Sequence, residues 1–198
     1  MENTRVENPH PQDELRARTI GVRDTIDPVD RLSRAEAISS NLDTLPSFSE
    51  AGAIGFYYAT GSEVPVHGLV QRVVETEGRR AFLPFVLSGR LELSDWRPSD
   101  PVSQGGQIPF QPRFRRAVSL QEVDAIVVPG LAFDRHGRRL GSGQGLYEGL
   151  LARLPESVAR IGIAFADQIV DDLSETGSDR VVDAVVTEDA VIDCRSDG

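Results

Sequence analysis

The segment VDAIVVPG, residues 123–130, carries the clearest indication of the fold class. Consecutive apolar residues run from Ala125 to Val128, so a strand formed here has apolar side chains on both faces. Strands of that kind are typical of parallel sheets that helices cover on both sides. The segment therefore predicts an inner strand of a mainly parallel sheet.

Apolar runs and amphipathic segments alternate along the rest of the chain. Further strand-like runs cover residues 51–59, 80–86, 91–96, 159–170 and 183–189. Residues 64–78 place apolar side chains at helical spacing, and residues 13–45 suggest two helices. The break between those two helices is expected at Asp27-Pro28, because proline is accepted at a helix start and not inside a helix. The alternation predicts an α/β fold, a three-layer α/β/α sandwich.

The domain boundaries follow from the same pattern. Residues 1–11 are expected to be a disordered tail, and residues 12–193 a single domain with a frayed end beyond it. Residues 97–116 carry four prolines and two adjacent glycines, so they are expected to form a long loop.

The segment GSGQG, residues 141–145, follows the 123–130 strand after a short connector. Glycines at 141, 143 and 145 can adopt positive φ and leave their backbone N–H groups accessible to an anion. A helix that begins near Leu146 would add its positive N-terminal end. The loop suits a polyphosphate, although a mobile turn between strand and helix remains an alternative. Its spacing matches neither the P-loop nor the G-x-G-x-x-G motif.

The charge balance excludes some classes of partner. All 21 basic residues are arginines, and 31 acidic residues give a net charge of -10. Nonspecific binding to nucleic acid or to an anionic membrane needs an excess of positive charge, so neither partner is expected. No apolar run has the length of a transmembrane helix. The single cysteine, Cys194, favours a reducing compartment, and we expect a cytoplasmic monomer.

Other candidate residues are less specific. Several carboxylates fall near expected strand ends or near the glycine loop, and a pair of them could hold magnesium. They are Asp134, Glu148, Asp183, Glu188 and Asp189. Tyr57, Tyr58 and Trp96 could stack on a flat heterocycle or could simply be core residues.

The glycine loop and the strand before it form one longer motif, VDAIVVPGLAFDRHGRRLGSGQGLYE. It resembles the signature of the 5-formyltetrahydrofolate cyclo-ligase family, also called methenyltetrahydrofolate synthetase. The matching residues are Val128, Pro129, Gly130, Ala132, Phe133, Asp134, Gly137, Arg139, Leu140, Gly141, Gly143, Gly145 and Tyr147. Weaker similarity extends from about Leu15 to Asp189.

The resemblance implies a sandwich like those of ribose-5-phosphate isomerase and CoA-transferases. It also implies that ATP and Mg²⁺ are used to convert 5-formyltetrahydrofolate to 5,10-methenyltetrahydrofolate, with release of ADP and phosphate. In that reaction the formyl oxygen is phosphorylated, N10 attacks the iminium phosphate, and loss of phosphate closes the ring. The protein must align the γ-phosphate with the formyl oxygen and neutralise its charge.

The resemblance also assigns roles to individual residues. Arg139 and Tyr147 are expected to be catalytic. ATP is expected to contact Arg16, Arg139, Leu140, Gly141, Ser142, Gly143, Gln144, Gly145, Leu146 and Tyr147. The reduced folate is expected to contact Tyr58, Glu63 and Trp96, and the magnesium ion Glu148 and Asp189.

Several positions depart from the family pattern. Gln12 stands where the family has an ATP-binding lysine, four residues before Arg16. Glu148 replaces an aspartate, Ser142 an aromatic residue and Gln144 a glycine. In the 97–116 loop, Gln111 replaces a glutamate before Pro112. The alternative hypothesis is therefore a diverged homologue that binds a nucleotide or a folate without this turnover.

Overall fold

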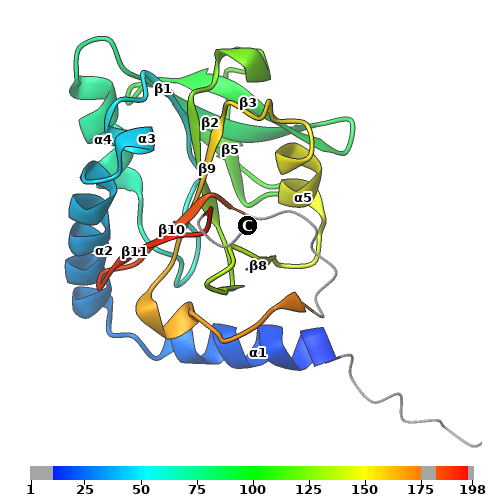
Figure 1. Ribbon diagram of the computed structural model, residues 1–198. Helices are drawn as coiled ribbons and strands as arrows, with labels where there is room; N and C mark the ends of the chain where they lie inside the picture. The colour runs from blue at the N-terminus through cyan, green and yellow to red at the C-terminus, as the bar shows by residue number, and fades with distance from the viewer. Residues whose placement is uncertain (1–10, 175–181, 196–198) are drawn as a thin grey trace, which may run out of the picture.

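A computed structural model describes residues 11–174 and 182–195 (Figure 1). Its centre is a seven-stranded sheet with the strand order β11, β10, β9, β6, β1, β2, β3. The strands are β1 (Ala53–Gly55), β2 (Arg80–Leu87), β3 (Arg90–Trp96), β6 (Ala125–Pro129), β9 (Ala159–Ile163), β10 (Ala184–Val186) and β11 (Val191–Asp193). Strand β6 lies between β1 and β9 and is parallel to both. The expected inner strand and the mainly parallel sheet are confirmed.

The two edges of the sheet are antiparallel. Strand β3 is antiparallel to β2, and β11 is antiparallel to β10. The five strands between them run parallel to one another: β10, β9, β6, β1 and β2. All side chains of β1 and β10 are buried, because both faces of the sheet are covered.

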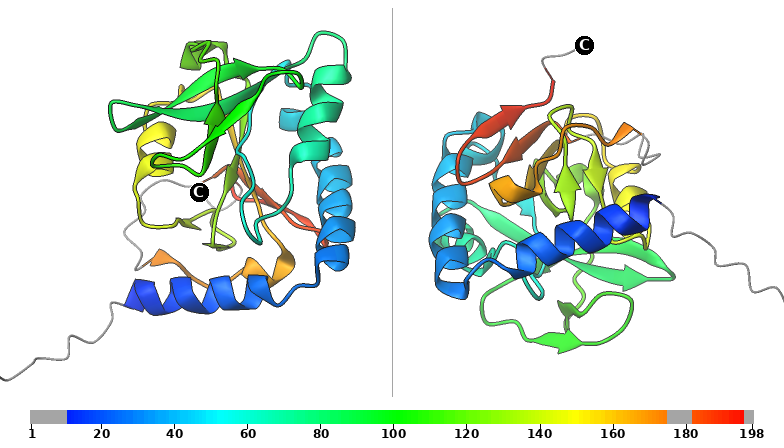
Figure 2. Two further views of the ribbon diagram at one scale, coloured as in Figure 1. Left: turned by 180° about the vertical axis from the view of Figure 1, so that it is seen from behind. Right: turned by 90° about the horizontal axis from the view of Figure 1, so that it is seen from below.

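Helices cover the sheet on both faces, as the sandwich requires (Figure 2). One face packs against α2 (Pro28–Asp43), α3 (Pro46–Ser49) and α4 (His67–Glu75) through a core that includes Leu42 and Phe48. The other face packs against the short helix α5 (Leu146–Leu151). Helix α1 (Pro11–Asp24) lies across one end of the sheet (Figure 1).

The break between α1 and α2 falls where it was predicted. Pro28 is the first residue of α2, and the Asp27 side chain accepts a 2.8 Å hydrogen bond from the Val29 N–H. Helix α1 begins at Pro11, one residue before the expected domain start, and residues 1–10 lie outside the described residues. At the other end, Cys194 is half-buried and its N–H bonds the Asp183 carbonyl, so it belongs to the domain and not to a frayed tail.

Two expectations about local structure were wrong. Residues 97–116 are not only a loop, because β4 (Val102–Gln104) and β5 (Phe110–Pro112) pair as an antiparallel ribbon. The expected strand at 159–170 ends at Ile163 and is followed by the 3₁₀ turn η2 (Ala166–Gln168). The Gln168 side chain stabilises this turn by accepting a hydrogen bond from the Phe165 N–H.

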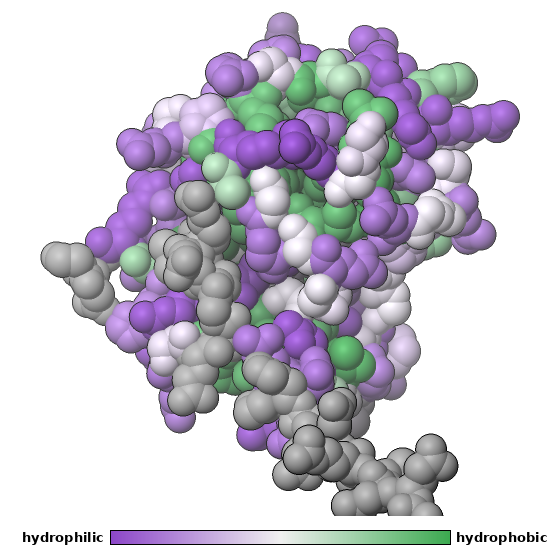
Figure 3. Space-filling view, turned by 90° about the vertical axis from the view of Figure 1, so that its right-hand side faces the viewer, coloured by the Kyte–Doolittle hydropathy of each residue, from purple (hydrophilic) through white to green (hydrophobic). Residues whose placement is uncertain are grey.

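The face shown in Figure 3 has a polar rim, and apolar residues show within its central hollow. None of the helices in the described part of the chain has the length and apolar content needed to cross a membrane.

Candidate active site

A cavity of about 210 Å³ opens at the carboxyl ends of β1 and β6. This is where open parallel sheets bind their ligands. Most of the residues singled out from the sequence line it. They are Tyr58, Glu63, Arg139, Gly141, Ser142, Gln144, Gly145, Leu146, Tyr147 and Glu148. Arg16 and Gly143 lie beside it, as described below.

The three glycines of the loop are required for two different reasons: lack of space at Gly141, and positive φ at Gly143 and Gly145. A Cβ on Gly141 would lie 2.7 Å from Glu148 Oε1 and 2.8 Å from Arg139 Nη1, so these two side chains occupy the space. Gly143 has φ of 91°, as predicted for the centre of the loop. Gly145 has φ of 68° and stands at the start of α5. The expected helix start near Leu146 is confirmed.

A short hairpin brings Arg139 to the cavity. Strands β7 (Ala132–Phe133) and β8 (Arg139–Leu140) pair antiparallel directly after β6. The guanidinium is 5% exposed and donates from Nε to the Pro129 carbonyl at 2.7 Å and from Nη1 to Glu148 Oε1 at 2.6 Å. It also lies 5.3 Å from the Tyr147 ring centre, within cation–π range. Arg139 is therefore held in one orientation at the glycine loop.

Asp134 supports this hairpin and is not available to a metal. Its carboxylate is fully buried and accepts hydrogen bonds from the backbone N–H groups of His136, Arg138 and Leu173. The Arg138 guanidinium also pairs with it at 3.2 Å. Asp134 thus shapes the turn that places Arg139.

Helix α1 brings Arg16 to the opposite side of the loop. Arg16 Nε donates to the Gly141 carbonyl at 3.1 Å, and its guanidinium lies 3.6 Å from the place of a Cβ on Gly143. Arg16 also pairs with Asp13 at 2.8 Å and donates to Gln12 Oε1 at 3.1 Å. Residues 12 and 16 therefore share the helix face that meets the glycine loop.

Gln12→Lys is expected to tighten ATP binding about tenfold at low salt, since a charge-assisted hydrogen bond to phosphate contributes roughly 1–3 kcal/mol. The new ammonium would stand one helical turn before Arg16 on the same face. The gain should shrink as salt is raised, because part-exposed charges are screened. Calorimetric titration of ATP at two salt concentrations measures both effects.

Gln71→Lys provides the matched control for that experiment. Gln71 lies on α4 and hydrogen-bonds Glu75 on an exposed surface, outside the lining of the cavity. This variant adds the same charge, so any equal gain in ATP affinity would reflect net charge alone. An unchanged affinity for Gln12→Lys at low salt contradicts the placement of residue 12 beside the phosphates.

Another part of the cavity lining includes Tyr58, Glu63 and a residue that the sequence did not indicate, Phe110. Tyr58 packs against Phe110 of the β4–β5 ribbon with ring centres 4.6 Å apart. The Glu63 carboxylate accepts a 2.8 Å hydrogen bond from the Thr60 N–H. Burial and the negative charge of Glu63 raise the pKa of Tyr147, so this phenol is protonated at neutral pH and can donate a hydrogen bond.

Trp96 is not brought to this cavity. It lines a neighbouring apolar cavity of about 250 Å³, which shares Tyr57 and Tyr58 with the first, and only 6% of its surface is exposed. Trp96 packs in the core on the α4 side of the sheet, whereas α5, which follows the glycine loop, packs on the other side. Trp96 is therefore a residue of the α4-side core.

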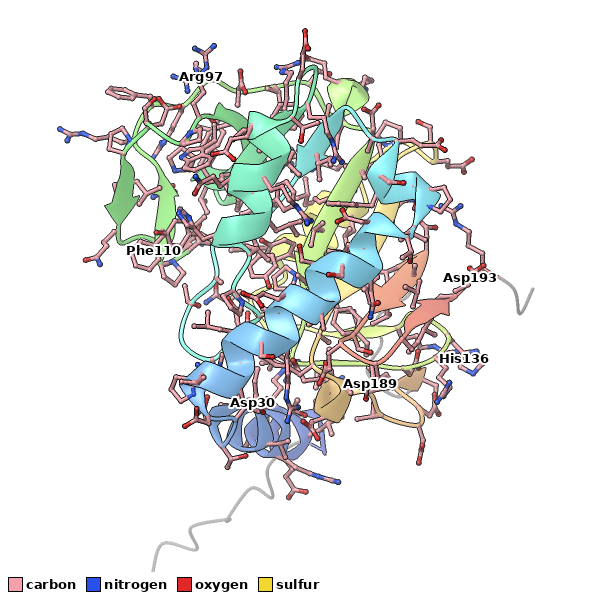
Figure 4. The ribbon with its side chains drawn as sticks, turned by 90° about the vertical axis from the view of Figure 1, so that its left-hand side faces the viewer. Asp30, Arg97, Phe110, His136, Asp189 and Asp193 are labelled. Carbon is pink, nitrogen blue, oxygen red and sulfur yellow. The ribbon has the colours of Figure 1, made fainter. Side chains whose placement is uncertain are left out.

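The two proposed metal ligands are also far apart. Glu148 lines the cavity, whereas Asp189 is exposed in the turn between β10 and β11. Figure 4 shows Asp189 on the other side of α2 from Phe110, which lines the cavity. Within residues 11–174 and 182–195, no group of three or more Asp, Glu, His or Cys side chains is placed to hold a metal ion.

The remaining carboxylates have structural partners. Glu188 pairs with Arg34 and accepts from the Ala166 N–H. Asp183 pairs with Arg195 and accepts from the Arg160 N–H.

Comparisons with known proteins point to one family. A family model described as the 5-formyltetrahydrofolate cyclo-ligase family matches residues 9–188. The 5-formyltetrahydrofolate cyclo-ligase of Mycolicibacterium smegmatis is 27% identical over 187 residues, which is 91% of this chain and 95% of that protein. The Escherichia coli enzyme of the same name is 23% identical over 175 residues, covering 85% of this chain and 96% of that one.

A solved structure gives the same result. The 5,10-methenyltetrahydrofolate synthetase of Aquifex aeolicus superposes with a TM-score of 0.84 and 30% identity, covering 96% of this chain and 95% of that one. Because the family model covers most of the chain and this structural similarity spans nearly all of it, the chain belongs to the 5-formyltetrahydrofolate cyclo-ligase family.

Proposed function

We propose that this chain catalyses the ATP-dependent cyclisation of 5-formyltetrahydrofolate to 5,10-methenyltetrahydrofolate. Its family is one of ATP-dependent enzymes. The observation that carries the proposal is the arrangement of one cavity: the glycine loop with Arg139 forms one wall, and Tyr58, Glu63 and Phe110 form another. A phosphate donor and a flat heterocycle can therefore meet in the same space.

The glycine loop is suited to the phosphates of ATP. Gly143 and Gly145 have positive φ, a conformation in which successive backbone N–H groups can face an anion. Arg16 and Arg139 supply positive charge from opposite sides of Gly141. Positioning and charge neutralisation are the main requirements of phosphoryl transfer, and these two arginines meet them here without the lysine that the family has at position 12.

The buried position of Arg139 suits the transition state. Charge spreads over the γ-phosphoryl oxygens as the formyl oxygen attacks, and a fixed guanidinium stabilises it without reorganisation. Tyr147, protonated at neutral pH, would donate a hydrogen bond to a phosphate or to the formyl oxygen. N10 then attacks the carbon of the iminium phosphate and loses its proton to solvent, and phosphate leaves with the C–O bond electrons.

Magnesium fits this site through one protein carboxylate. Mg²⁺ usually keeps several waters and binds one or two carboxylates together with substrate phosphates. Glu148 is placed for that role in the cavity wall, although its Oε1 now pairs with Arg139. When bound, the ion would neutralise phosphate charge, and Asp189 would take no part.

Glu63→Ala is expected to weaken binding of 5-formyltetrahydrofolate at least tenfold, because a charge-assisted hydrogen bond from the pteridine N–H groups is lost. Binding of ATP should change about twofold or less, since the Glu63 carboxylate bonds Thr60 and makes no hydrogen bond to the glycine loop. Calorimetry of each ligand separately measures the two losses. Equal losses for both ligands would contradict the assignment.

Glu92→Ala is a matched control for Glu63→Ala. Glu92 is a part-buried carboxylate on β3 that pairs with Arg153 at 2.9 Å, outside the cavity lining. Glu92→Ala should lower the melting temperature slightly and leave the binding of both ligands unchanged.

The direct test of the function is turnover. Purified protein is mixed with Mg-ATP and 5-formyltetrahydrofolate, and the absorbance of the methenyl product is followed. Product that appears only with ATP supports the proposal. Binding of both ligands without product would favour the alternative, a diverged homologue in which Gln12, Ser142, Gln144 and Glu148 have abolished turnover.

The remaining expectations about partners and location are also proposals. A net charge of -10 argues against partners that are themselves polyanions. Cys194 is a free thiol, which suits a reducing compartment such as the cytoplasm. A monomer is tested by light scattering during gel filtration.

A further inference from the structure

Arg23 is a buried arginine that the mechanism above does not use. It lies near the end of α1, and 8% of its surface is exposed. Its Nε donates a 2.9 Å hydrogen bond to Ser62 Oγ, and that hydroxyl donates to the carboxylate of Asp24. Burying a guanidinium without partners costs free energy, and the bond to Ser62 offsets part of that cost. The same bond connects α1 to residue 62.

Ser62 belongs to the turn that carries Glu63. Residues 60–63 lie outside the helices and strands, and Gly61 has φ of 56°. Within the turn, the Glu63 carboxylate accepts from the Thr60 N–H. The turn is joined to the helical layer by the Arg23–Ser62 bond and by a longer contact of 3.4 Å from Arg31 to the Gly61 carbonyl.

The same helix holds the other wall of the cavity. Arg16 donates to the Gly141 carbonyl of the glycine loop, and Arg23 to the turn at residue 62. Seven residues separate them, which is about 10 Å along an α-helix. One rigid helix therefore spans from the loop proposed for ATP to the turn proposed for the folate.

We propose that Arg23 is a positioning residue for the folate substrate: through Ser62 it fixes the turn that presents Glu63 to the cavity. This inference rests on the proposed function. This role explains why a buried guanidinium lies beside the turn, although the turn already has an internal hydrogen bond from the Thr60 N–H to Glu63. If Ser62 lost its bonds to Arg23 and Asp24, the longer Arg31 contact would remain, and the Glu63 carboxylate could then move relative to Tyr147 and the glycine loop.

Ser62→Ala tests the inference with little change in volume. We expect KM for 5-formyltetrahydrofolate to rise about tenfold, because a small displacement of a binding group is enough to lose its hydrogen bonds. Values of kcat and of KM for ATP should stay within about twofold, since Arg16 and Arg139 are unchanged. Hydrogen exchange of the amides of residues 60–64 should become faster. Arg23→Lys, which keeps a donor and the charge, should show a smaller rise in KM.

Ser94→Ala is the matched control. Ser94 is a fully buried serine of β3 whose hydroxyl accepts from the Arg116 N–H, and it does not line the cavity. This variant should lower the melting temperature as much as Ser62→Ala does or more, with KM for the folate unchanged.

The outcomes separate the inference from the function on which it rests. Failure of the unsubstituted protein to bind or convert the folate refutes the proposed function, and the inference with it. If the unsubstituted protein is active, an unchanged folate KM in Ser62→Ala overturns the inference, even where exchange at 60–64 is faster. Equal rises in KM for the folate and for ATP, or a rise shared by Ser94→Ala, would show a general loss of structure and overturn it too.

Discussion

Arg139→Lys is expected to lower kcat by roughly 10² to 10³, the usual loss when one fixed donor to developing charge is removed. The guanidinium makes two hydrogen bonds, to the Pro129 carbonyl and to Glu148, and lies over the Tyr147 ring. Its second terminal nitrogen, Nη2, lies beside Gly141, 3.0 Å from the place of a Cβ there. A lysine ammonium is a single point charge and cannot make these contacts together.

Arg138→Lys is the matched control, one residue away on the same hairpin. Arg138 is about one-third exposed and pairs with Asp134 and Asp172, away from the cavity. We expect it to keep kcat within about threefold, since a lysine keeps a positive charge beside Asp134 and the backbone N–H bonds to Asp134 remain. Steady-state kinetics and melting temperatures of both variants are needed, because a buried lysine at 139 also lowers stability. Equal kcat in the two variants would show that Arg139 is structural.

The sequence predicted the parts of the fold that depend on local pattern. Strand β6 could be placed because its residues are apolar on both faces, and only a covered parallel strand satisfies that pattern. Pro28 located the start of α2, since proline suits the first helical turn. The positive φ of Gly143 could be expected from the spacing of the glycines alone.

Features that depend on distant contacts were not predictable in the same way. The β4–β5 ribbon was hidden by its prolines, so the Phe110 contact with Tyr58 was missed. For Trp96 the sequence left open a ring contact with the folate or a place in the core, because the side of a strand residue depends on register, here Ala81 opposite Trp96. The family resemblance paired Asp189 with Glu148, and the position of Asp189 near an expected strand end gave no lateral position within the sheet. The Arg16–Gly141 bond joins residues 125 positions apart, and only the family resemblance suggested it.

The ion pair between Glu148 and Arg139 could not be predicted from the sequence either. Glu148 was expected as a metal ligand, and its Oε1 also pairs with Arg139 Nη1 at 2.6 Å. A glutamate reaches the guanidinium across the glycine loop, and Gly141 leaves the room for both. ATP and a metal ion would therefore compete with an existing ion pair, which links nucleotide binding to the freedom of Arg139.

Gly143→Val is expected to weaken ATP binding at least 100-fold, since a β-branched residue is strained at positive φ and its methyl groups fill the space above the loop. Gly143 has φ of 91°. A Cβ there would stand 3.6 Å from the Arg16 guanidinium carbon, so the methyl groups of valine would push Arg16 from the Gly141 carbonyl. Calorimetry with ATP measures the loss. The melting temperature should change little, because the loop is exposed.

Two further variants separate the causes of that loss. Gly143→Ala keeps the strain of positive φ but adds only a Cβ at ordinary contact distance from Arg16, so its loss of ATP affinity should be smaller. Gly149→Val places the same side chain on α5, where a Cβ has nothing within 4 Å and the backbone is helical, and should leave ATP binding unchanged. Normal ATP binding by Gly143→Val would mean that the loop is a plain turn and that the phosphates lie elsewhere. A graded loss from Ala to Val, with Gly149→Val unaffected, would place the phosphates between Gly143 and Arg16, where the missing lysine of the family would also have reached.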